Sequence, residues 1–202
     1  MISTPDWAPF ELAPVSAHAD APRSIHALDG IGDRMRAAAF AEFQAREAFL
    51  WGAHHFTDAD PSLRDAWREF ANIEDRHFQM LLKRMSELGI QIPGRKVSDH
   101  LWHSLVACKS AREFAFAISV AEERGRKAGE RFSQALEKTD AKTALIFKTI
   151  ADEEVEHIAL PAKFFNESEM AQLHASTSKS TRSAMSDLFE RGDLDELRQN
   201  DR

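Results

Sequence analysis

The chain has 202 residues, a formal net charge of −7, 43% hydrophobic and 29% charged residues. This length suits one well-packed domain, and the acidic balance argues against a nucleic-acid partner. A single cysteine, Cys108, rules out an internal disulfide and does not support a thiolate metal cluster. The first 22 residues lack the basic flank and apolar stretch of a signal peptide, and no apolar run approaches the roughly 20 residues of a membrane span. We therefore expect a cytoplasmic protein with no membrane partner.

The first 29 residues contain four prolines and predict an extended arm. A helical period of apolar residues begins near Gly30 and continues through "RMRAAAFAEFQAREAFLWGAHHF". The segment "TDADPSL" interrupts it, with Asp60 as the expected N-cap and Pro61 in the first turn of a second helix. That second helix is expected to stop at Gly89.

A long connection with a short helix in "SDHLWHSLVAC" follows. Ser110 and Glu113 fit a capping box at the start of a third long helix, and a turn at "KTD" leads into a fourth that ends near Phe165. Two short-linked helix pairs joined by one long crossover predict an all-α protein, a ferritin-like four-helix bundle. We divide the chain into an arm (1–29), the bundle (30–165) and a polar C-terminal helical tail (166–202).

Each long helix places one glutamate on its predicted buried stripe, because positions three and four apart share a helix face. The second and fourth glutamates begin Glu-x-x-His motifs, which add a histidine one turn later. In the third helix Glu122 and Glu123 are hard to separate. We favour Glu122, which lies four residues after Ile118 and three before Gly125. The predicted metal ligands are Glu47, Glu74, His77, Glu122, Glu154 and His157.

Buried carboxylates are costly unless they are paired or bind metal. Two divalent cations would neutralise four glutamates, and mixed oxygen and nitrogen donors suit two Fe ions or a Mn/Fe pair, with Zn as a substitute. The plain alternative is that each Glu-x-x-His motif is a surface pair, which is common in acidic helices. The order Glu, Glu-x-x-His, Glu, Glu-x-x-His with helix-length gaps favours the metal site instead.

The chain resembles the ferritin-like superfamily, and in particular an uncharacterised bacterial family of ferritin-like proteins. The similar segments are "EFQAREAF", "FANIEDRHFQMLLKRMSELG", "FAFAISVAEERGRKAGERF" and "IADEEVEHIALPAKFF". They span roughly residues 34 to 165 and do not cover the arm or the tail. The resemblance implies the bundle fold and, by motif match, the same six ligands, but it implies no substrate.

The leading functional hypothesis is an oxidase or hydroxylase that activates O₂ and acts on an unidentified small molecule. Radical chemistry on a tyrosine is excluded because the chain has no tyrosine. A rubredoxin-type iron site is excluded as well, because it needs more than one cysteine. The alternatives are an inert metal-binding protein, an iron-oxidising store, and a structural interaction module. The catalytic residues stay unknown at this point, and a homodimer is one expected state of assembly.

Overall fold

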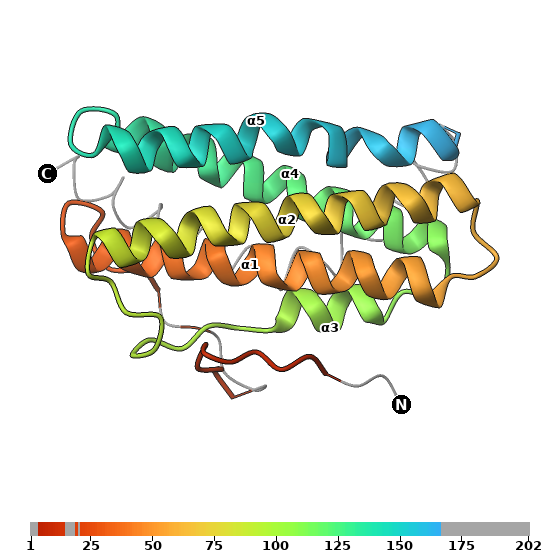
Figure 1. Cartoon of the computed structure of the whole chain (residues 1–202), viewed down its shortest axis with the longest axis horizontal. Coiled ribbons are helices and arrows are strands. Elements are labelled where there is room, and N and C mark those ends of the chain that lie inside the picture. Colours follow the sequence, from red (N-terminus) through yellow and green to blue (C-terminus); the bar gives the residue numbers. More distant parts are fainter. Residues whose placement is uncertain (1–3, 15–18, 20, 167–202) are drawn as a thin grey trace, which may run out of the picture.

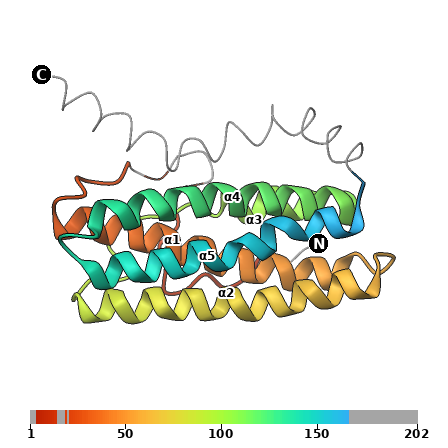
Figure 2. The same ribbon diagram turned by 90° about the horizontal axis from the view of Figure 1, so that it is seen from above.

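The computed structural model describes residues 4–14, 19 and 21–166. All regular structure in these ranges is helical, and none of it forms a strand, so the predicted all-α class is confirmed there. Four long helices lie along one axis, and one short helix, the third in chain order, packs beside the first (Figure 1, Figure 2). The helices are α1 (Leu28–His55), α2 (Pro61–Glu87), α3 (His100–Val106), α4 (Ala111–Leu136) and α5 (Ala141–Phe164). Apart from Asn166, the predicted C-terminal tail lies outside the described residues.

The helix starts follow the capping signals of the sequence. The Asp60 carboxylate accepts a hydrogen bond of 2.8 Å from the backbone N–H of Ser62, and Pro61 occupies the first turn of α2. The Ser110 hydroxyl accepts from the N–H of Glu113 at 3.2 Å and begins α4. Asp140 caps α5 in the same way. These bonds satisfy N–H groups that a first helical turn leaves without an internal partner.

The long helices pack in two pairs. Helix α1 packs mainly against α2, and α4 packs mainly against α5, each pair being joined by a short loop. The segment 88–110, which includes α3, connects the two pairs. Large apolar side chains fill the space between the helices, and the largest fully buried ones include Trp67, Phe40, Phe49 and Phe114.

Helix α1 is buried on a second side as well, because the arm and α3 cover it. The ring of Trp7 in the arm lies 5.3 Å from Phe40 and 5.1 Å from Phe43, and 5.8 Å from Trp102 of α3. Backbone bonds between the arm and Val97 fix this arrangement, with Val97 N–H donating to the carbonyl of Glu11 at 2.9 Å. The arm is therefore part of the core rather than a loose extension over the residues described.

None of the described helices is both long and apolar enough to cross a bilayer.

Candidate metal centre

Helices α2 and α5 bring their two Glu-x-x-His motifs together between the helices. The exposed fraction is 0% for Glu74 and for His77, 2% for Glu154 and 3% for His157. Spacing of three residues places the carboxylate and the imidazole of each motif on the same helix face, one turn apart. Both motifs therefore face the interior from opposite helix pairs.

The two central carboxylates each lie between both imidazoles. Glu74 approaches His157 Nδ1 at 2.8 Å through Oε1 and His77 Nδ1 at 3.9 Å through Oε2. Glu154 approaches His157 Nδ1 at 2.9 Å through Oε2 and His77 Nδ1 at 3.2 Å through Oε1. Each carboxylate thus offers one oxygen to each imidazole, which is the arrangement expected of groups shared by two adjacent cations.

The other two long helices complete the cluster with one carboxylate each. Glu42 of α1 lies 3.6 Å from His77 Nδ1 through Oε2. It forms a set of four donors with Glu74, His77 and Glu154, whose ligand atoms lie within 4.8 Å of one another. Glu122 of α4 forms a second set with Glu74, Glu154 and His157 by the same measure. Two potential cation positions therefore share Glu74 and Glu154.

Most polar atoms of the two Glu-x-x-His motifs have no hydrogen-bond partner among the described residues. Among the described residues, nine buried side-chain nitrogen and oxygen atoms have no hydrogen-bond partner, and seven belong to Glu74, His77, Glu154 and His157. Buried polar groups in folded proteins nearly always form a hydrogen bond, because a buried donor or acceptor left without one costs about 1–3 kcal/mol. Cations would satisfy both carboxylates and both Nδ1 atoms. Carboxylate oxygens and imidazole nitrogens fit Fe, Mn or Zn.

The charges of the metal-free cluster are strongly perturbed. Burial, reinforced by the neighbouring Glu154 carboxylate, raises the pKa of Glu74 and of Glu122 well above the ordinary value. Burial acts the same way on Glu154, but His157 and His77 lower its pKa to about 2. Burial disfavours a charged His77, yet the carboxylates of Glu154 and Glu42 raise its pKa to about 10. Without a cation the cluster therefore retains protons that metal binding would displace.

The two histidines differ in what lies behind them. His77 Nε2 lies 2.7 Å from Glu153 Oε2, and Glu153 also pairs with Arg76. His157 Nε2 has no hydrogen-bond partner among the described residues, and its ring lies 3.9 Å from the Phe70 ring centroid. The Phe49 ring adds an edge contact to His157 at 5.8 Å. The carboxylate of Glu153 thus orients His77 from the side away from the cluster, whereas aromatic rings pack against His157.

The structure brings together five of the six predicted ligands and leaves out Glu47. Glu47 is 25% exposed at its side chain, and its Oε1 accepts from Arg46 at 3.0 Å and 2.7 Å. Glu42 occupies the position in the cluster that was expected for Glu47. The preference for Glu122 over Glu123 agrees with the geometry, since Glu123 pairs with Arg126 and Lys127 away from the cluster.

The difference between the predicted and the observed acid on α1 has a clear physical cause. The aromatic stripe through Phe40 and Phe43 points to Glu47, but those rings pack against Trp7 of the arm. Of the four residues three and four positions from Glu42, three are alanines, so this acid gives only a weak signal of a buried stripe. The sequence does hold another signal: Glu74 follows Glu42 by 32 positions, as Glu154 follows Glu122 by 32. Equal spacing in the two helix pairs would have identified Glu42.

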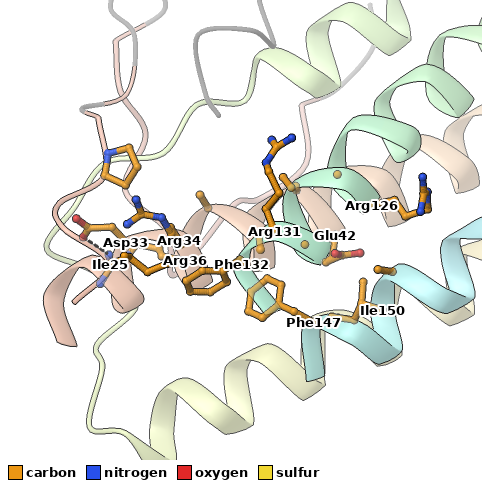
Figure 3. Close-up of a pocket in the computed structure, with 18 of the residues that line it drawn as sticks. Ile25, Asp33, Arg34, Arg36, Glu42, Arg126, Arg131, Phe132, Phe147 and Ile150 are labelled. Atoms are coloured by element: carbon orange, nitrogen blue, oxygen red, sulfur yellow. Dashed lines mark hydrogen bonds and ion pairs between the residues drawn. The ribbon is translucent and has the colours of Figure 1, made fainter. Parts of the chain in front are cut away.

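A pocket of about 340 Å³ reaches the cluster from outside. Glu42, Glu122 and Glu154 line its inner end, and it passes between α1 and α4 toward the start of α1. Figure 3 shows Glu42 and Arg126 toward one end, the rings of Phe132 and Phe147 beside the middle, and Arg36 toward the other end. The cluster is therefore buried but accessible to a small molecule.

Comparison with known proteins gives a family and no function. A family model described as "Protein of unknown function (DUF455)" matches residues 10–198. No curated protein and no solved structure matches the chain.

Proposed function

The chain belongs to the DUF455 family of proteins of unknown function, and we propose that it is a dimetal-carboxylate oxidoreductase with a ferritin-like four-helix bundle. In this proposal it holds two Fe ions, or Mn and Fe, and uses O₂ to oxidise or hydroxylate a small molecule. The observation that supports the proposal most is the pair of fully buried carboxylates, Glu74 and Glu154, that lie between two imidazoles without hydrogen bonds.

Each residue of the cluster has a distinct part in binding. Glu74 and Glu154 would be shared by the two cations, Glu42 and His77 would complete one position, and Glu122 and His157 would complete the other. When bound, the metal pair supplies redox equivalents and a Lewis acid next to O₂. Glu153 keeps the His77 ring oriented by accepting a hydrogen bond at Nε2, so that Nδ1 faces the cluster.

The surroundings favour an enzyme over an inert metal site. A purely structural site needs only a closed set of ligands, whereas a catalytic site keeps one side accessible. Here a pocket leads to Glu42, Glu122 and Glu154, and apolar side chains such as Phe132 and Ile150 line it. Such walls would exclude bulk water from the inner end while admitting a substrate.

The first test is metal content. We expect about two Fe or Mn ions per chain in protein produced with both metals, and a loss of at least half in Glu154→Gln, which keeps the size of the side chain. Glu156→Gln, an exposed change on the same helix, is the matched control and should keep the wild-type content. Folded wild-type protein that binds no Fe or Mn would refute the proposal. Metal binding without O₂ consumption by the reduced protein would refute the oxidase part alone.

A further inference from the structure

The pocket next to the cluster changes character along its length. From the carboxylates at its inner end, the walls become small and apolar, with Ala38 and Ala41 on α1 and Gly125 and Gly129 on α4. A Cβ atom added at Gly125 would meet nothing within 4 Å. Gly125 is itself exposed, so this open space lies at the surface one turn away from Glu122, and the rings of Phe132 and Phe147 line the pocket further along.

The rest of the pocket lining is basic, although the chain as a whole is acidic. Apart from the three cluster carboxylates, one acid lines the pocket together with six basic residues: Asp33, Arg34, Arg36, Arg95, Lys96, Arg126 and Arg131. Four of the arginines have bonds to the protein: Arg36 donates to the carbonyls of Ile92 and Gln91, Arg34 to those of Arg23 and Gly30, Arg95 to that of Ala21, and Arg126 pairs with Glu123.

Two neighbouring cations mark the outer end of the pocket. Arg95 NH1 lies 3.5 Å from Asp33 Oδ2, and its NH2 donates to the carbonyl of Ala21. Lys96 is exposed and forms no ion pair with any residue that the structure describes. A basic group that has no ion-pair partner within the described residues and lies beside an apolar pocket suits an anionic head group, because charge-assisted hydrogen bonds are the stronger ones.

The size of the pocket limits the molecule. Its volume lies at the lower end of the range of small-molecule sites and corresponds to roughly a dozen non-hydrogen atoms at about 30 Å³ each. Arg34 and Glu42 are eight residues apart on α1, which is about 12 Å along the helix axis at 1.5 Å per residue. A slender molecule is needed to cover that distance within such a volume.

We infer that the pocket binds a medium-chain monocarboxylate, with its carboxylate at Lys96 and Arg95 and its apolar chain extending toward Glu42 and Glu122. This inference rests on the proposed function for its meaning, since the chain end would then be the part presented to the metals. Binding of the monocarboxylate itself depends on the pocket and its basic residues, and not on the metal ions.

The test is calorimetric titration of metal-free protein with decanoate, and with decan-1-ol as the uncharged analogue of nearly equal size. Decanoate should bind at least tenfold more tightly than the alcohol. Lys96→Glu should weaken decanoate binding at least tenfold, whereas Lys83→Glu, the same change at an exposed lysine outside the pocket, should leave it within twofold. Decyl phosphate is the third ligand, and it should not bind more tightly than decanoate.

Blocking the pocket gives an independent test. Gly125→Leu fills open space and should abolish decanoate binding, while Gln134→Leu on the exposed side of α4 should not. Circular dichroism checks that both variants are folded. Equal binding of acid and alcohol, equal effects of the two lysine variants, or no effect of Gly125→Leu would each overturn the inference.

Other outcomes would also contradict it in recognisable ways. Decanoate that binds only the metal-loaded protein, without an effect of Lys96→Glu, would place the carboxylate at the cluster and reverse the orientation. Tighter binding of decyl phosphate would replace the carboxylate by a phosphate head group. The metal content of the wild type is measured separately, so failure of the dimetal proposal and failure of this inference are distinguishable.

Discussion

Glu74 on α2 and His157 on α5 lie 2.8 Å apart, from Oε1 to Nδ1, although they belong to different helix pairs. The contact has a counterpart between Glu154 on α5 and His77 on α2, at 3.2 Å from Oε1 to Nδ1. Each helix pair thus contributes one glutamate to the histidine of the other pair. The interior is held together at this point by ionisable groups, so its stability must depend on protons or on cations.

The first prediction concerns the pH dependence of the metal-free protein. The pKa of His77 is raised from 6.5 to about 10 in the fold, so its contribution to stability is fully present below about pH 6.5 and is lost as pH rises toward 10. The raised pKa values of Glu74 and Glu122 act in the same direction above their ordinary value. We expect the Tm of chelator-treated protein to fall by on the order of 5 °C or more between pH 6.5 and 9.5.

Bound metal should remove this dependence, because a cation replaces the protons and stabilises the native state that binds it. The measurement is a set of thermal melts across pH, with and without metal. Metal-free His77→Gln is the control, and its Tm should fall less steeply than that of the wild type. A wild-type Tm that rises through this pH range would show that the cluster does not hold its protons.

The second prediction compares the same Glu→Gln substitution at two glutamates of α1, Glu42 and Glu47. Glu42→Gln should remove a donor from one cation position and weaken one of the two binding steps at least tenfold. Glu47→Gln should stay within twofold of the wild type, because Glu47 pairs with Arg46 outside the cluster. Titration of both variants with Mn²⁺ or Fe²⁺ measures this directly. The reverse order of effects would restore Glu47 as the ligand.

Much of the fold and of the site follows from local rules that the sequence obeys. Capping by Asp60, Ser110 and Asp140 locates three helix starts, and each cap is a bond between neighbouring residues. Glu-x-x-His spacing likewise works within one helix, so His77 and His157 could be assigned to a common interior. Local chemistry therefore predicts what happens inside a helix.

The choice between Glu42 and Glu47 depends on tertiary packing, which local periodicity does not reveal. Helix α1 is buried on two sides, since Trp7 and α3 cover the side opposite to the cluster. Apolar periodicity cannot tell which of two buried sides faces the other helices. The pocket could not be predicted from the sequence either, because its walls come from the start of α1, the 95–97 segment and α4, which meet only in the folded protein.

The third prediction concerns the arm. Trp7 is 5% exposed and contacts Phe40, Phe43 and Trp102, so its loss would leave a cavity under the arm. Trp7→Ala should lower the free energy of unfolding by about 3 kcal/mol, the low end for a buried Trp→Ala change. Denaturant unfolding of the metal-free protein measures it, with Leu50→Ala at an exposed position of α1 as control. A loss below about 1 kcal/mol would mean that the arm contributes little to the core.

The last prediction follows from the unequal surroundings of the two histidines. Glu153 accepts from His77 Nε2, whereas His157 Nε2 has no such partner among the described residues. Loss of a carboxylate behind a metal-binding histidine typically costs 10–100-fold in metal affinity. Glu153→Gln should therefore weaken one of the two binding steps by about that factor. The other step should stay unchanged, because His157 is positioned by Phe70 and Phe49.

Metal titration monitored by calorimetry measures the affinities of the two binding steps separately, with exposed Glu156→Gln as the matched control. Glu153→Gln keeps an amide oxygen that can still accept from Nε2, so Glu153→Ala should have the larger effect if orientation matters as well as charge. Equal weakening of both steps would show that Glu153 stabilises the cluster as a whole. A single affected step would establish that the two cation positions differ, and that the His77 position owes its affinity to the carboxylate behind the ring.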